Sequence, residues 1–456
     1  NKQTFFQNKK ILTEINRKKK TRNFQGIAID SRIVKKGNLF LTIKGKRNDG
    51  SKFISKAIKK GASYIVSSKK FKKFNKRLIH VKNEINFLNN FASRKRAYTN
   101  AKIIGITGSA GKTSLKNLVK NLLENYGKTF CSPKSYNNHF GVPLSLSQLS
   151  ANHKFGIFEI GMSEAGEIKF LSKLVKPHIG VITNIGEAHI ENFDSLKGIA
   201  SAKGELIENI HKNGTIVLNR DDRYFRYLEK KAKQKNLKII TFGFSKKADV
   251  HPVKTIKINN KKKFQVKIFN QDYFVEIGNI NTYNVLASLA ILKLLDLNIN
   301  QILKFYKRYE AIPGRGKIYK IFRYKKFFNL IDESYNANPL SVKTAIQNFN
   351  AIKKQNFNKY LLLGDMLELG NKSEILHKDL SKVINKSDID KVFVKGCKSL
   401  ITYKYVSKNK RGNIFQQDED IDFTLNDIIS NNDYLMIKGS NATGLNNFCK
   451  RIIKGF

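Results

Sequence analysis

The segment Ile103-Ile104-Gly105-Ile106-Thr107-Gly108-Ser109-Ala110-Gly111-Lys112-Thr113-Ser114 decides the fold of this chain. Its apolar start, Ile103–Thr107, predicts a buried β-strand, and the glycine-bearing turn that follows leads into a helical pattern near Leu115. Glycines in such a turn let backbone amides face a polyphosphate, and the helix N-terminus adds the positive end of a dipole. The segment therefore predicts a phosphate-binding loop.

Two side chains of this loop have a defined chemistry. Lys112 is placed to reach the outer phosphates of a nucleotide, and Thr113 is placed to offer its hydroxyl to magnesium. The strict Walker pattern has glycine where this chain has Ile106, so the match is to a Thr-Gly-x-x-Gly-Lys-Thr variant. We therefore assign nucleotide binding to residues 107–114, although the loop by itself does not identify the reaction.

Short apolar runs alternate with amphipathic stretches through most of the 456 residues, which predicts an α/β fold with parallel sheets. Residues 249–277 alternate instead and predict antiparallel strands at a sheet edge, and residues 281–295 predict a helix. Domain boundaries are expected near Tyr98 and Ile312, giving domains 1–98, 99–312 and 313–456. The other expected strands are Gly26–Asp30, Leu39–Ile43, Ser63–Val66, Gly156–Ile160, Gly180–Asn184, Thr215–Leu218, Phe328–Ile331, Tyr360–Leu363, Lys391–Val394 and Tyr434–Ile437.

The composition is strongly basic. Lys and Arg number 86 against 35 Asp and Glu, a net charge of +51 that by itself favours nucleic acid or an anionic membrane as a partner. The charge is spread along the whole chain, however, and abundant Lys, Asn, Ile and Phe with no Trp are typical of drift toward AT-rich codons. No apolar run reaches the ~18–20 residues of a membrane span, and the first thirty residues lack the order of a signal peptide. Together with three widely spaced cysteines, this predicts a cytoplasmic protein without disulfides.

Three later residues stand where a parallel sheet would gather them near the loop. Glu159 ends one apolar strand and His189 follows the next, and ligands of doubly wound sheets bind outside the carboxyl ends of the strands. A carboxylate there is able to hold magnesium against phosphates. Taken singly, each residue also has an ordinary explanation: Glu159 as a solvated strand end, His189 as a structural histidine, and Lys203 as one of many helix-face lysines.

The order of these segments resembles the Mur ligases, the ATP-dependent amide-bond ligases of peptidoglycan precursor synthesis. The resemblance is carried by Thr107–Thr113, Asn137–Pro143, Glu159–Met162, Asn184–His189 and Ala202–Glu205. Asp332–Pro339, Leu363–Gly370 with His377, and the N-terminal Asp30-Ser31-Arg32, Leu39-Phe40, Lys44-Gly45 and Asp49-Gly50 are similar to the family member that adds D-alanyl-D-alanine. Because the matches occur in all three expected domains, a borrowed nucleotide-binding module is not a sufficient explanation.

The resemblance implies a three-domain Mur ligase architecture. Residues 1–98 would bind the UDP-N-acetylmuramoyl-peptide, and residues 99–312 would form the catalytic ATP-binding domain around a central P-loop parallel sheet. Residues 313–456 would form a Rossmann-like α/β domain that closes on ATP and binds the incoming dipeptide.

The resemblance also implies roles for individual residues. Lys112, Glu159, His189 and Lys203 would be catalytic, with Lys203 carrying a carbamate that joins Thr113, Glu159 and His189 in holding magnesium. Beyond the loop, the ATP contacts would be Asn281, Asn284, Arg315 and Asp332. The substrate-binding residues would be Ser31, Arg32, Lys44, Asp49, Asn137, Asn138, Tyr335, Asn336 and Asn338. Ile280, Asn441 and Ser51 depart from the family pattern, which has histidine, arginine and histidine there.

The reaction implied is the ATP-dependent joining of D-alanyl-D-alanine to UDP-N-acetylmuramoyl-tripeptide through an acyl phosphate, with release of ADP and phosphate. The cofactors would be ATP and Mg²⁺, the protein would act as a monomer, and no nucleic-acid partner is expected. Whether the third residue of the tripeptide is diaminopimelate or lysine stays open.

Four other interpretations are weighed against this one. A sister ligase adding another amino acid, or a folylpolyglutamate-type ligase, would share the central domain, but the 334–339 segment and the first domain argue against both. A nucleic-acid-stimulated P-loop ATPase would need Lys and Arg clustered on one face with interleaved aromatics. A decayed, non-catalytic homologue is disfavoured because Lys112, Glu159, His189 and Lys203 occur together.

Overall fold

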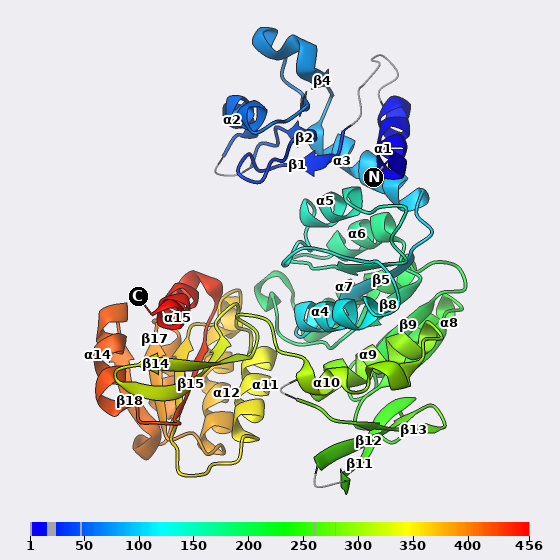
Figure 1. The fold of residues 1–456 in the computed structure, drawn as a ribbon. Helices are drawn as coiled ribbons and strands as arrows, with labels where there is room; N and C mark the ends of the chain where they lie inside the picture. Colours follow the sequence, from blue (N-terminus) through cyan, green and yellow to red (C-terminus); the bar gives the residue numbers. More distant parts are fainter. Residues whose placement is uncertain (1, 16–23, 46–47, 259–260, 279, 456) are drawn as a thin grey trace.

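The computed structural model describes residues 2–15, 24–45, 48–258, 261–278 and 280–455. Its helices and strands form three lobes that follow one another along the chain, with the N-terminal lobe at the top of Figure 1 and the C-terminal lobe at the lower left. Each lobe is built on its own sheet, and each of the three sheets contains parallel strand pairs. The predicted α/β class is confirmed.

The N-terminal lobe contains a four-stranded parallel sheet in the order β1-β2-β3-β4. Its strands are β1 (Gly26–Ala28), β2 (Asn38–Leu41), β3 (Tyr64–Ser67) and β4 (Leu78–His80), and its helices are α1 (Lys2–Ile15), α2 (Ile54–Lys59) and α3 (Glu84–Ala97). Strand β4 was not predicted because its apolar run is too short to stand out. The guanidinium of Arg96 in α3 donates to the backbone oxygens of Val175 and Lys176 at 2.7 Å each, which joins this lobe to the central one.

The central lobe contains a nine-stranded sheet in the order β13-β12-β11-β10-β9-β8-β5-β7-β6. Strands β5 to β10 pair in parallel, while β11, β12 and β13 form the antiparallel edge that the alternating 249–277 segment predicted. The strands are β5 (Lys102–Thr107), β6 (Thr129–Cys131), β7 (Phe155–Glu159), β8 (Ile179–Ile182), β9 (Thr215–Asn219), β10 (Lys238–Phe242), β11 (Val250–Ile258), β12 (Lys261–Ile268) and β13 (Gln271–Val275). The helices are α4 (Lys112–Leu123), α5 (Gly141–Ser147), α6 (Glu167–Val175), α7 (Leu196–Glu208), α8 (Phe225–Gln234), α9 (Thr282–Leu294) and α10 (Phe305–Arg308).

Strand β5 lies between β7 and β8, so the carboxyl ends of these three strands form one edge. Ile106 of β5 is in register with Glu159 of β7, and Thr107 is in register with Ile182 of β8. This register places the phosphate loop between the segments that follow β7 and β8. It is the position at which open parallel sheets bind ligands.

The C-terminal lobe contains a six-stranded sheet in the order β14-β15-β19-β16-β17-β18, antiparallel only between β14 and β15. Its strands are β14 (Lys317–Arg323), β15 (Lys326–Glu333), β16 (Lys359–Gly364), β17 (Lys391–Lys395), β18 (Arg411–Phe415) and β19 (Tyr434–Lys438). Its helices are α11 (Pro339–Asn350), α12 (Ser373–Asn385), α13 (Ser399–Tyr405), α14 (Asp418–Ile428) and α15 (Leu445–Lys454). The four strands predicted for this lobe are present, and the two edge strands β14 and β18 were missed.

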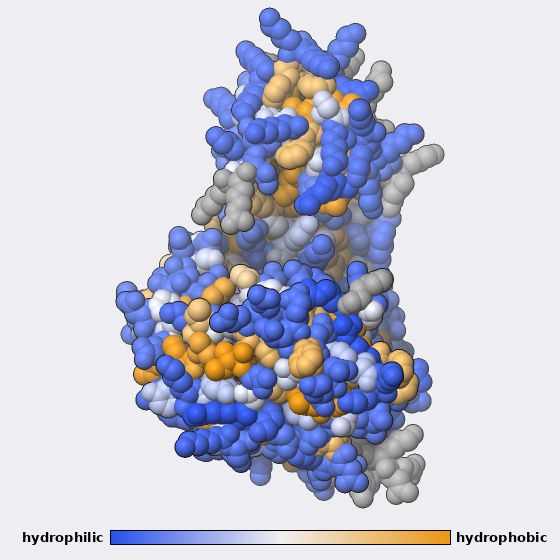
Figure 2. Space-filling model, turned by 90° about the vertical axis from the view of Figure 1, so that its left-hand side faces the viewer, coloured by the Kyte–Doolittle hydropathy of each residue, from blue (hydrophilic) through white to orange (hydrophobic). Residues whose placement is uncertain are grey.

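Hydrophilic residues cover most of the face shown in Figure 2, on the upper as well as the lower lobe. Apolar side chains also reach this surface, and the exposed ones in the C-terminal lobe include Phe322, Phe327, Ile414 and Phe423. Among the described helices, none is long and apolar enough to cross a bilayer.

Candidate active site

The phosphate loop joins β5 to α4 through two glycines with positive φ angles. Gly108 has a φ of +144° and Gly111, the N-cap of α4, has a φ of +83°. Residues that carry a side chain rarely adopt such φ angles, which explains why glycine occupies both positions. The ammonium of Lys112 donates to the Gly108 oxygen at 2.6 Å, so this side chain folds back over the loop.

The segment after β8 holds the phosphate loop in place. The oxygen of Asn184 accepts from the Ser109 amide at 3.0 Å, and its side-chain oxygen accepts from the Ala110 amide at 2.8 Å. The hydroxyl of Thr183 donates to the Ala110 oxygen at 2.7 Å. The predicted strand Gly180–Asn184 is therefore too long, because β8 ends at Ile182 and the next two residues bind the loop.

Glu159 lies at the centre of a buried polar network beside the loop. The hydroxyl of Thr113 donates to its Oε2 at 2.8 Å, and the amide of Asn137 donates to its Oε1 at 2.8 Å. The ammonium of Lys116 lies 3.3 Å from Oε2, and both side chains are 1% exposed. The alternative that Glu159 is a solvated strand end is therefore wrong.

The charges around Glu159 control its ionisation. Burial would raise the pKa of this carboxyl, but the positive charges of Lys116, Lys112 and Arg315 outweigh that effect and hold the pKa below its usual value. Burial lowers the pKa of Lys112, an effect that Glu159 opposes and Arg315 reinforces. The site thus contains an ionised carboxylate surrounded by cations, a setting that favours further negative charge from phosphates.

Lys203 is buried rather than solvated. It lies on α7 with 2% of its surface exposed, and burial together with the positive charge of Lys112 lowers its pKa well below the usual value. The alternative of an ordinary surface lysine is therefore wrong, and the amine has a strongly reduced tendency to carry a proton.

His189 contacts the C-terminal lobe. Its Nδ1 lies 2.7 Å from Oε2 of Glu368, which belongs to the predicted Leu363–Gly370 segment, and this contact lowers the pKa of Glu368. The backbone amide of Glu191 also donates to the backbone oxygen of Glu368 at 3.3 Å. Neither hydrogen bonds nor ion pairs join His189 to Thr113, Glu159 or Lys203 in the described part of the chain, so its place in a magnesium site stays a prediction.

Two more predicted residues of the C-terminal lobe approach the phosphate loop. The amide of Asn338, the N-cap of α11, donates to the Ser109 oxygen at 3.2 Å. Arg315 donates to the Ser135 hydroxyl at 3.2 Å, and its guanidinium lies 4.2 Å from the ring centre of Tyr335. The lobe is thus docked against the central lobe at its predicted ATP-contacting side.

The carboxylate of Asp332 is buried and hydrogen-bonded within its own lobe. Its carboxylate accepts from the Gly314 amide at 2.7 Å and from the Ser334 hydroxyl at 2.6 Å, and the residue is 4% exposed. The carboxylate thereby fixes the linker that carries Arg315. A direct nucleotide contact of Asp332 stays a prediction.

The predicted adenine-side residues lie at the start of α9. Asn281 is the N-cap, and its side-chain oxygen accepts from the Asn284 amide at 3.4 Å. A Cβ atom added to Gly111 would lie 3.2 Å from Oδ1 of Asn284. The start of α9 is therefore adjacent to the phosphate loop, while contacts of Asn281 and Asn284 with ATP stay predictions.

The predicted substrate residues fall into separate groups. Ser31 and Arg32 follow β1 and Lys44 and Asp49 follow β2, at one edge of the N-terminal sheet, where Arg32 pairs with Asp30 at 2.7 Å and Asp49 pairs with Lys69 at 2.8 Å. Asn138 accepts from the Gly141 amide at 2.9 Å at the start of α5, and the Asn336 oxygen accepts from Lys438 at 3.1 Å. Of these predicted substrate residues, Asn137 and Asn338 lie at the phosphate-loop region. Tyr335 lies near it through its contact with Arg315.

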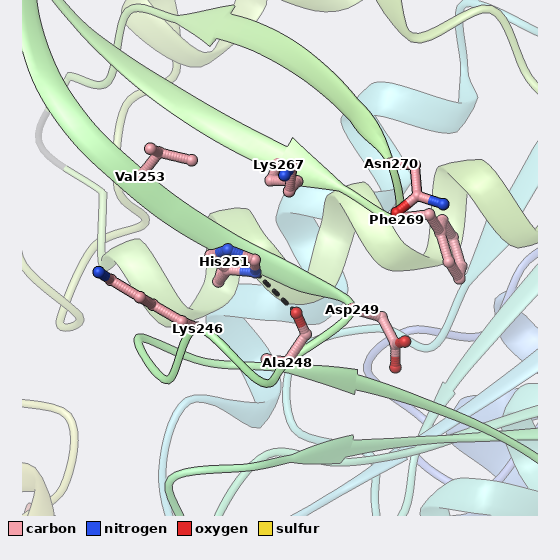
Figure 3. Close-up of a pocket in the computed structure, with 8 residues that line it drawn as sticks. All are labelled: Lys246, Ala248, Asp249, His251, Val253, Lys267, Phe269 and Asn270. Atoms are coloured by element: carbon pink, nitrogen blue, oxygen red, sulfur yellow. Dashed lines mark hydrogen bonds between the residues drawn. The ribbon is translucent and has the colours of Figure 1, made fainter.

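A separate hollow of about 630 Å³ lies on the antiparallel edge of the central sheet, and Figure 3 shows eight of its residues. They come from the β10–β11 loop, from β11, from β12 and from the β12–β13 turn, and they include Lys246, His251 and Lys267. His251 is hydrogen-bonded through Nδ1 to the Ala248 oxygen at 2.7 Å. The predicted catalytic and ATP-binding residues are not among those lining it.

Fold and site together define a protein with a phosphate-loop nucleotide-binding lobe whose loop is contacted by a second α/β lobe. Residues 23–96 match the Mur ligase family, catalytic domain; residues 106–292 match the Mur ligase middle domain; and residues 321–441 match the Mur ligase, glutamate ligase domain. The UDP-N-acetylmuramoyl-tripeptide–D-alanyl-D-alanine ligase of Rickettsia prowazekii is 32% identical over 93% of this chain and 94% of its own length. The chain belongs to the Mur ligase family.

Solved structures agree with this assignment. MurF from Acinetobacter baumannii superimposes with a TM-score of 0.85 at 25% identity, covering 99% of this chain and 98% of its own. MurF ligase from Thermotoga maritima in complex with ADP has a TM-score of 0.80 at 25% identity, covering 94% of this chain and 97% of its own. The three-domain Mur ligase architecture implied by the sequence is therefore confirmed, while the exact domain boundaries stay predictions.

We predict that Gly108→Ala disrupts the phosphate loop. The added Cβ would lie 1.9 Å from Oγ1 of Thr183, at a φ that alanine tolerates poorly. We expect a lower melting temperature and a loss of ADP affinity of at least about tenfold, measured by thermal unfolding and calorimetry. Gly198→Ala is the control, because its Cβ would make an ordinary 3.4 Å contact inside α7. Wild-type ADP affinity in Gly108→Ala would contradict the loop geometry.

We also predict that Glu368→Ala weakens the docking of the C-terminal lobe. The variant removes the carboxylate that contacts His189, and a partly exposed pair of this kind shifts a docking equilibrium by up to about fivefold. Small-angle scattering and distances between labels on the two lobes should show more open molecules. Glu374→Ala, an exposed acid of α12, is the control. Identical distance distributions for both variants and the wild type would contradict a contribution of the Glu368 carboxylate to docking.

Proposed function

We propose that this chain joins D-alanyl-D-alanine to UDP-N-acetylmuramoyl-tripeptide, using ATP and releasing ADP and phosphate. The observation that carries the proposal is the constellation of Lys112 with the buried Thr113, Glu159 and Lys203 at the phosphate loop, which the C-terminal lobe contacts. Relatives that match nearly the full length of the chain carry the name of this activity, which supports the choice of substrates.

The chemistry requires a better leaving group than the oxygen of a carboxylate. ATP would convert the terminal carboxylate of the tripeptide to an acyl phosphate, with ADP departing. The amine of D-alanyl-D-alanine would then attack the acyl carbon, and phosphate would leave from the tetrahedral intermediate. The first step brings an anion toward a polyanion, so neutralisation of charge is the main task of the site.

The residues at the loop suit this task. Lys112 keeps N–H donors free beyond its bond to Gly108, and the N-terminus of α4 points at the same place. Arg315 adds a positive charge from beyond the interdomain linker and acts on both Lys112 and Glu159. Lobe docking would therefore complete the charge of the site and exclude water from the acyl phosphate.

The residues present also fit magnesium. The Thr113 hydroxyl donates to Glu159, which leaves the hydroxyl lone pairs available, and a carboxylate with two hydrogen-bond donors and one ion-pair partner retains acceptor capacity. The depressed pKa of Lys203 favours the neutral amine that must add to carbon dioxide to give a carbamate. Thr113, Glu159, carbamylated Lys203 and His189 would hold the ion, whose charge stabilises the transferring phosphoryl group when it is bound.

The other two lobes would bind the rest of the substrates. We assign the UDP-N-acetylmuramoyl part to the N-terminal lobe, at the strand ends that carry Ser31, Arg32, Lys44 and Asp49. The incoming dipeptide is assigned to the C-terminal lobe near Tyr335, Asn336 and Asn338. The closeness of Tyr335 and Asn338 to the phosphate loop supports this placement.

The function is tested by phosphate release from ATP in an omit-one series. The complete mixture contains magnesium, UDP-N-acetylmuramoyl-tripeptide and D-alanyl-D-alanine. We expect release only when all components are present, together with a UDP-linked pentapeptide detected by mass. Phosphate release that does not depend on either substrate but increases with DNA or RNA would instead favour the nucleic-acid-stimulated ATPase.

For Lys203→Ala we predict loss of turnover by at least about a hundredfold, the scale of losing one group that stabilises transition-state charge. Short carboxylates added to the assay should restore part of the rate, because they replace the missing carbamate oxygens. Lys197→Ala, an exposed lysine of the same helix, should leave turnover unchanged. Near-normal turnover of Lys203→Ala without additives would rule out the proposed role.

A further inference from the structure

A second lysine of α4 has an environment unlike that of a surface lysine. Lys116 lies four residues after Lys112, and its side chain is 1% exposed. Its ammonium donates to the Ser132 oxygen at 2.8 Å and to the Lys134 oxygen, and it lies 3.3 Å from Oε2 of Glu159. Lys116 thus connects three elements: helix α4, the segment after β6 and the end of β7.

The three partners of Lys116 separate its role from that of Lys112. Two of the three N–H donors of the ammonium go to the Ser132 and Lys134 carbonyls, and the Glu159 carboxylate 3.3 Å away is its ion-pair partner. Among the described residues, the ammonium of Lys112 donates to one acceptor, the Gly108 oxygen, which leaves its other N–H groups for a phosphate. Lys116 is therefore committed to protein atoms, whereas Lys112 is available to a ligand.

The contacts of Lys116 determine where Glu159 and Asn137 lie. Lys134 has a φ of +46°, a left-handed conformation that a non-glycine residue adopts at some cost, and its carbonyl is one of the acceptors of Lys116. The same segment continues to Asn137, whose amide donates to Oε1 of Glu159. One buried ammonium therefore orients the carboxylate directly, through Oε2, and indirectly, through the segment that supplies the donor to Oε1.

We infer that Lys116 is a positioning residue that holds the Glu159 carboxylate in the orientation needed to bind the nucleotide-associated cation. The inference rests on the proposed function in taking Glu159 as a ligand of that cation. A purely structural lysine would stabilise the fold without changing the cation dependence of nucleotide binding. Groups that orient a metal ligand typically change metal affinity by about 10–100-fold when they are removed.

The test is calorimetric titration of ADP with and without magnesium, because it needs neither the acceptor substrates nor turnover. Lys116→Met replaces the ammonium by an apolar group of similar length. We expect its metal-free ADP affinity to stay near the wild-type value, and the gain in affinity on adding magnesium to fall at least about tenfold. Lys120→Met, one turn further along α4 and more exposed, is the matched control and should behave as wild type.

Three outcomes would overturn the inference or its basis. An unchanged magnesium effect in Lys116→Met contradicts the positioning role. A loss of metal-free ADP affinity as large as that of Lys112→Met shows that Lys116 contacts phosphate instead. A wild-type protein whose ADP affinity does not respond to magnesium contradicts the ligand role of Glu159, and with it the proposed function rather than the inference alone. Should Lys116→Met not fold, Lys116→Arg is judged by the same two affinities.

Discussion

The buried carboxylate of Glu159 constrains the rest of the active site. An ionised carboxylate removed from water is costly unless it is paired and hydrogen-bonded, and removing one partner of such a pair is strongly destabilising. Glu159 is compensated by groups from α4 and from the segment after β6. The phosphate loop, the 132–137 segment and the end of β7 therefore have to assemble together. These contacts form without a nucleotide, and such preorganised groups stabilise charge without reorganisation during the reaction.

The C-terminal lobe contributes to the same site from several points of its chain. Arg315 lies at the start of the lobe, Asn338 caps α11, and Glu368 follows β16, yet all three contact the central lobe. Their positions are fixed relative to one another by the sheet of the lobe, so the contacts form or break as a group when the lobe moves. In this arrangement the lobe supplies a positive charge, a contact to the phosphate loop and the partner of His189 together. The carboxylate of Asp332 fits this arrangement because it ties down the backbone beside Arg315.

The sequence was informative where the local signal and the tertiary structure agree. Strands such as Ile103–Thr107 and Tyr360–Leu363 are buried on both faces, and their apolar runs were sufficient to locate them. Strands β4, β6, β10, β14 and β18 were missed; β4 and β6 have only three residues each, and β14 and β18 are the edge strands of the C-terminal sheet. The phosphate loop and the four catalytic candidates were found through motif order. The Lys116–Glu159 and His189–Glu368 contacts were not, because they join residues far apart in sequence or on different lobes.

The lysine content shows why composition could not identify these residues. The chain has 86 basic side chains, and at physiological ionic strength the charges of exposed ones are screened beyond about 8 Å. Lys116 and Lys203 differ from them by being almost wholly buried, where one charge acts on its neighbours with little screening. In the sequence, Lys116 stands out only by lying four residues after Lys112. Such spacing places both lysines on one side of a helix and says nothing of their burial. The functional distinction among the lysines is thus one of environment, which depends on how α4, α7 and the end of β7 pack.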